Sequence, residues 1–74
     1  MRSESIIMNS GSVVQIRGSV VDICFEHKLP SIYTVLHVDD ERIILEVLTQ
    51  LDQRHVRAIA LTPTQGLARG MAVI

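Results

Sequence analysis

Turn signals interrupt this 74-residue chain so often that only short segments of regular structure fit between them. Gly11 and Gly18 bracket one segment, Pro30 lies in a polar loop, and Pro63 opens a further loop that contains two glycines. The intervening segments are rich in β-branched residues, because the chain has nine Val and nine Ile against four Ala. β-branched side chains favour strands over helices. The chain is therefore expected to form one small all-β domain.

Alternation of apolar and polar residues predicts which side chains share one face of each strand. Asp22 falls on the opposite face from its apolar neighbours and can pair across strands with Arg17 or Arg57. Gly18 marks a bulge or tight bend between two strand segments. The residues predicted to share one face are Val21, Ile23 and Phe25 in residues 19–25, Ile32, Leu36 and Val38 in residues 32–38, and Val56, Ala58 and Ala60 in residues 55–61, where Arg57, Ile59 and Leu61 form the other face.

Residues 42–51 fit two patterns equally well. A strand places Ile43, Leu45, Val47, Thr49 and Leu51 on one face, whereas a helix capped by Asp40 gives a stripe of Ile43, Ile44, Val47, Leu48 and Leu51. Short strands on both sides favour the strand. Residues 39–41 read as a charged turn, residues 52–53 as a two-residue hairpin connection, residues 62–70 as a loop, and residues 71–74 as the start of a last strand.

Five or six short strands with tight turns predict a small, closed, six-stranded, Greek-key-like β-barrel. Closing the sheet removes the exposed edges that invite association. We assign residues 11–74 to this barrel and residues 1–10 to a flexible leader, with a short edge strand as the alternative for the leader. The apolar residues 6–8 are too few for the core of a signal peptide.

Charge, aromatic and cysteine content argue against nucleic acid as a partner and favour a reducing compartment. The net charge is −1 and the basic residues are scattered, whereas nucleic-acid-binding domains usually carry a strong basic excess. Phe25 and Tyr33 are the two aromatic residues, too few for a base-stacking platform. Cys24 is single, so no disulfide can form within the chain, which favours a reducing compartment. No run of about 18 apolar residues exists, so direct membrane insertion is not expected.

The sequence contains no recognisable catalytic, metal-binding or nucleotide-binding motif. His27, His37 and His55 lack the spacing of a metal motif, and the three acids at 39–41 read as a solvated turn. Cys24 lies among apolar residues with no histidine nearby, which indicates a buried, inert thiol. No phosphate loop, dinucleotide fingerprint or nucleophile elbow is present. We therefore predict no catalytic, cofactor-binding or metal-binding residues in this chain.

The order of segments resembles the opening of the catalytic β subunit of the rotary F-type ATP synthase. Five blocks carry the likeness in family order and spacing, at residues 11–22, 29–33, 45–47, 56–60 and 66–70. The noncatalytic α subunit shares the barrel, but its pattern fits these blocks less well. Departures occur at Ser19, at residues 48–52 and at Gln65, which points to a divergent branch of the family.

The resemblance implies the fold and the task of an N-terminal crown domain. In the family, three α and three β barrels alternate in a ring that holds the hexamer together, so neighbouring α subunits are the implied partners. ATP or ADP and Mg would bind the parent subunit outside this chain, and the parent would synthesise or hydrolyse ATP coupled to proton or sodium transport. The implied location is peripheral, on the cytoplasmic face of a bacterial inner membrane. The resemblance also settles residues 42–51 as a strand.

Further expectations concern the isolated chain. It should be monomeric or weakly self-associating, because the family ring alternates two different subunits. The last strand, at residues 71–74, should be frayed or unusually paired, and about ten further residues should raise the melting temperature. The alternative function is a free-standing small barrel that binds an oligonucleotide or a partner protein.

Overall fold

The computed structural model describes residues 10–74, which contain six strands and no helix. The predicted leader, with its edge-strand alternative, lies outside the described residues except for Ser10. With no helix in this range, none of the described chain could cross a membrane as a long apolar helix. The strands are β1 (Gly11–Arg17), β2 (Val20–Phe25), β3 (Val35–Val38), β4 (Ile43–Gln50), β5 (His55–Ala60) and β6 (Ala72–Val73).

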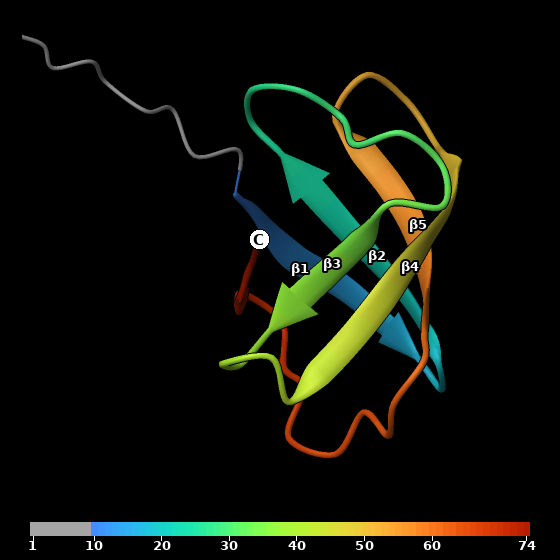
Figure 1. Cartoon of the computed structure of the whole chain (residues 1–74). Helices are drawn as coiled ribbons and strands as arrows, with labels where there is room; N and C mark the ends of the chain where they lie inside the picture. Colours follow the sequence, from blue (N-terminus) through green and yellow to red (C-terminus); the bar gives the residue numbers. More distant parts are fainter. Residues whose placement is uncertain (1–9) are drawn as a thin grey trace, which may run out of the picture.

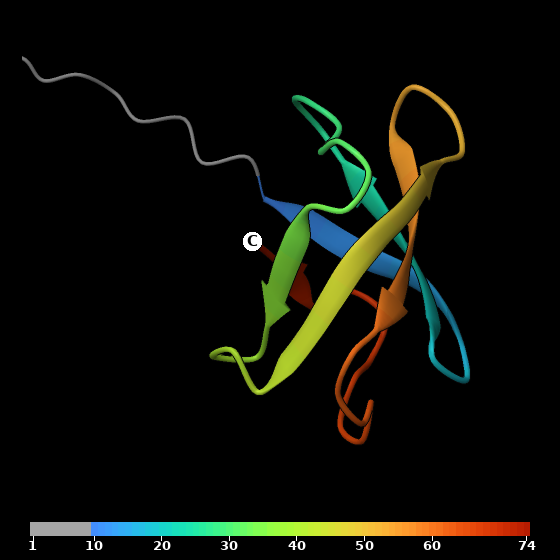
Figure 2. The same cartoon turned by 45° about the vertical axis from the view of Figure 1, so that its right-hand side comes forward.

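All strand pairs are antiparallel, and they close into a barrel with the order β1-β2-β5-β4-β3-β6. The short strand β6 completes the closure, since Val73 pairs with Gly11 of β1 and with Val38 of β3. Figures 1 and 2 both place β4 across the barrel interior from β1. The predicted all-β, closed, six-stranded barrel is confirmed.

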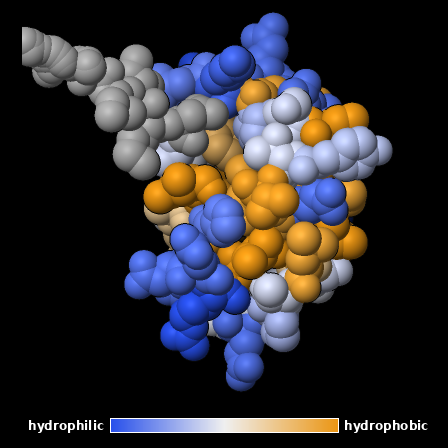
Figure 3. All heavy atoms as spheres, in the orientation of Figure 1, coloured by the Kyte–Doolittle hydropathy of each residue, from blue (hydrophilic) through white to orange (hydrophobic). Residues whose placement is uncertain are grey.

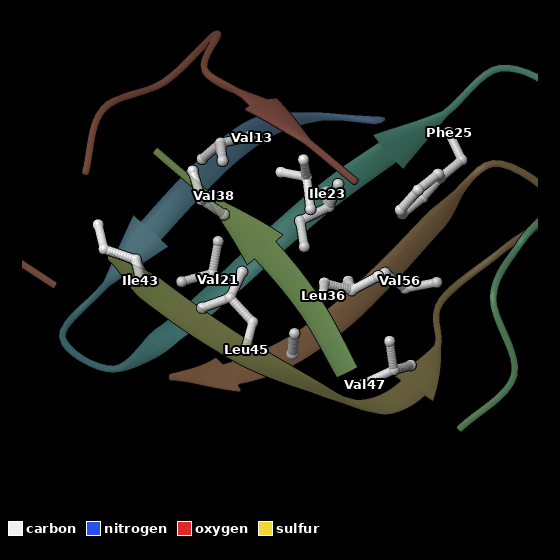
Figure 4. Close-up of a cluster of buried hydrophobic side chains, with 12 residues drawn as sticks. Val13, Val21, Ile23, Phe25, Leu36, Val38, Ile43, Leu45, Val47 and Val56 are labelled. Atoms are coloured by element: carbon white, nitrogen blue, oxygen red, sulfur yellow. The ribbon is translucent and has the colours of Figure 1, made fainter. Parts of the chain in front are cut away.

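The interior is filled by aliphatic side chains and one aromatic ring, which converge from all six strands (Figure 4). The shared face predicted for β2 is buried at Val21, Ile23 and Phe25, and of the two faces of β5 the buried one carries Val56 and Ala58, with Ala60 partly buried against the core. The buried set is Val13, Val21, Ile23, Phe25, Leu36, Val38, Ile43, Leu45, Val47, Val56, Ala58 and Val73.

Gly18 forms the tight bend that the sequence predicts. Arg17 pairs with Val20, so Gly18 and Ser19 make a two-residue turn between β1 and β2. The φ of Gly18 is 59°, and a positive φ at the first central residue is typical of a type II′ hairpin turn. Glycine adopts this conformation without the steric cost that a Cβ would add.

Within residues 42–51, Ile43–Gln50 form strand β4 rather than a helix, with Ile43, Leu45 and Val47 buried as the strand pattern predicts. The pattern is wrong beyond Val47, because Thr49 and Leu51 are exposed. The register shifts between Val47, opposite Ala58, and Thr49, opposite Arg57. This β-bulge adds one residue to β4 and changes the face on which the later side chains lie.

Two predicted boundaries are also wrong. The strand expected over residues 32–38 begins at Val35, and Ile32 is 48% exposed rather than inward, because residues 31–34 form a turn. The expected two-residue connection after β4 spans four residues, 51–54. It is held by Asp52, whose Oδ1 accepts hydrogen bonds from the backbone amides of Arg54 and His55, both at 2.8 Å.

Candidate interaction surface

The outward side of the β3–β4 hairpin carries hydrophobic side chains where a solvated sheet face would carry polar ones. Val35 on β3 lies opposite Glu46 on β4 and is 47% exposed. Leu48, at the β-bulge, is 43% exposed. Figure 3 shows hydrophobic side chains gathered across the middle of this view, over β3 and β4, between hydrophilic ends. Apolar patches rimmed by polar residues are typical of interaction sites.

The turn before β3 adds the two most prominent members of this surface, Ile32 and Tyr33. The amide of Thr34 donates to the carbonyl of Ser31 at 3.2 Å, which makes Ile32 and Tyr33 the central residues of a β-turn. Tyr33 has a φ of 71° and is 69% exposed. Positive φ at the second central residue defines a type II turn, where glycine is the usual residue.

Backbone hydrogen bonds fix this turn against β4. The Tyr33 amide donates to the carbonyl of Val47 at 2.7 Å, and the Val47 amide donates to the carbonyl of Thr34 at 3.0 Å. The carbonyl of Pro30 accepts from the Gln50 side chain at 3.1 Å. The turn is thus held beside the bulge that exposes Leu48. We call the surface formed by Ile32, Tyr33, Val35 and Leu48 the β3–β4 face.

An acidic turn borders the far end of β3. Asp39, Asp40 and Glu41 are exposed, as predicted, and all three have left-handed φ values between 55° and 69°. The Arg42 amide donates to the Asp39 carbonyl at 3.1 Å and closes the turn. A pocket of about 340 Å³ lies beside it, lined by His37, Asp39, Asp40, Glu41, Ala72 and Ile74. The Nδ1 atom of His37 is buried and has no hydrogen-bond partner among residues 10–74.

Asp22 and Arg57 form the cross-strand pair that the sequence analysis anticipated. They are register partners on β2 and β5, and Arg57 donates from Nε at 2.9 Å and from a terminal nitrogen at 3.1 Å. The hydrogen bond and charge of Arg57 hold the pKa of Asp22 below its usual value, against the opposing effect of burial. The same contact raises the pKa of Arg57. This ion pair therefore links strands β2 and β5 and has a structural role.

Reactive groups do not converge elsewhere in the described part of the chain. Cys24 is half-buried rather than buried, and it lines a pocket of about 220 Å³ with Ser10, Gly11, Ser12, Glu26 and His27. Within residues 10–74, no hydrogen bond links this thiol to a histidine that could activate it. No three His, Cys, Asp or Glu side chains gather in that range as metal ligands would. The prediction that the chain carries no catalytic, cofactor or metal residues stays a prediction.

The sequence pattern did not identify the β3–β4 face. Period-two alternation placed Ile32 on the same face as Leu36 and Val38, and tyrosine is not a residue that signals a left-handed turn position. The signal available in the sequence is Pro30, two residues before Ile32. It indicates a loop but does not predict which side chains of that loop are exposed.

Comparison with known proteins gives a consistent result. Residues 13–74 match the β-barrel domain of the ATP synthase alpha/beta family. The chain is 64% identical over 73 residues to ATP synthase subunit beta 2 of Albidiferax ferrireducens, covering 99% of this chain and 14% of that protein. It is 69% identical over 64 residues to ATP synthase subunit beta 2 of Polaromonas naphthalenivorans, covering 86% of this chain and 14% of that protein. It is 62% identical over 65 residues to ATP synthase subunit beta 1 of Psychromonas ingrahamii, covering 88% of this chain and 13% of that protein.

Proposed function

The chain belongs to the ATP synthase alpha/beta family, as its β-barrel domain, and from this premise we propose that it holds a beta subunit against its neighbours in the hexamer. The observation that carries the proposal is the family match over residues 13–74, together with relatives named as beta subunits. The neighbours in this proposal are alpha subunits, and the contacts are side by side between barrels.

The architecture supports a structural task. A closed barrel has no free sheet edge, so partners must meet it through side chains rather than by adding a strand. A domain of this size buries only about 60% of the surface that its unfolded chain exposes, so packing against neighbours adds stability. The exposed apolar residues of the β3–β4 face provide a surface for such packing.

In this proposal, the nucleotide-binding and catalytic residues of the parent enzyme lie outside this chain. The chain spans 13–14% of the length of the three beta subunits described above, and its sequence contains no phosphate loop. We place ATP or ADP, Mg and the coupling to proton or sodium transport in the parent subunit, outside residues 1–74. The parent would be a peripheral part of the complex on the cytoplasmic face of the inner membrane. A free-standing barrel that binds oligonucleotides is not favoured, since the net charge is −1.

Assembly of the parent synthase tests this proposal. Deleting these residues from the beta subunit should leave a catalytic part that no longer forms a stable hexamer with alpha subunits, as judged by size-exclusion chromatography with light scattering. The 74-residue chain alone should show no heat of binding when titrated calorimetrically with Mg-ATP. A truncated subunit that assembles normally, or micromolar binding of ATP by this chain, would contradict the proposal.

A further inference from the structure

We draw no further inference here: the strongest candidate, the pocket of about 340 Å³ between the acidic turn at residues 39–41 and the end of β6, rests on a cluster of acidic side chains, and His37 beside them is only partly buried, so no independent feature of residues 10–74 points to a ligand there.

Discussion

Removing the negative charge of Asp22 should lower the free energy of unfolding of the barrel at neutral pH. This effect should disappear in acid. Asp22→Asn keeps the shape of the side chain but replaces a two-point, charge-assisted contact with Arg57, at 2.9 and 3.1 Å, by a neutral one. The Asp22 side chain is only 8% exposed, so water replaces the lost contact poorly, whereas the Arg57 side chain is 35% exposed and can be rehydrated.

The expected cost lies between two limits. Exposed ion pairs contribute about 0.2–1 kcal/mol, and hydrogen bonds to charged groups contribute about 1.5–3 kcal/mol. Because one partner is buried and the other is partly solvated, we expect Asp22→Asn to lower the free energy of unfolding by about 1 kcal/mol at pH 7. In a domain of this size that corresponds to a melting temperature lower by about 4–8 °C. Asp40→Asn, an exposed change in the acidic turn, is the matched control and should stay within about 0.5 kcal/mol.

The pH dependence gives the sharper test. The hydrogen bond from Arg57 lowers the pKa of Asp22 in the folded chain below the ordinary aspartate value of 3.8. A lowered folded pKa means that the stabilisation is present above pH 3.8 and is lost as the pH falls through the folded pKa. Urea unfolding should therefore show a difference between Asp22→Asn and the unmodified chain that is constant from about pH 5 to 8 and shrinks below about pH 4. An equal difference at low and neutral pH, or none at pH 7, would refute the reasoning.

Three further substitutions test the packing and the turns by thermal or urea unfolding. Gly11→Ala should destabilise the barrel by about 1–3 kcal/mol, because its Cβ would lie 2.8 Å from the carbonyl oxygen of Cys24; no effect would contradict the close approach. Glu41→Gly should stabilise it by about 0.5–1 kcal/mol by relieving a φ of 69°, whereas Glu26→Gly, at an exposed loop position without positive φ, should not. Leu45→Ala, fully buried, should cost about 2–5 kcal/mol, and a smaller loss would mean a poorly packed interior.

Alternation of apolar and polar residues predicted the faces of a strand correctly where its pairing contains no β-bulge. Val21, Ile23 and Phe25 lie on one buried face because the pairing of β2 with β5 is regular along the whole strand. Residues 42–51 were ambiguous from periodicity alone; the short strands on both sides favoured a strand over a helix, and the family resemblance supported the same choice. The pairing of Asp22 with Arg57 was anticipated as one of two options and is confirmed.

What sequence reasoning missed depends on contacts between distant residues. The bulge at Leu48 follows from the register between β4 and β5, which no local pattern contains. The turn at Tyr33 is held by hydrogen bonds to Val47, fourteen positions along the chain, and it reverses the predicted orientation of Ile32. The candidate interaction surface arises from these two irregularities together. The predicted rise in melting temperature on lengthening the chain stays a prediction.

The binding of this chain to the alpha subunit tests the central claim most directly. Sedimentation velocity of the 74-residue chain, mixed with the complete alpha subunit of the same synthase, should show the chain comigrating with that subunit at about 100 µM. The chain by itself should sediment mainly as a monomer under the same conditions. Separate sedimentation of the two proteins at that concentration would contradict the account of this domain as a subunit-contact barrel.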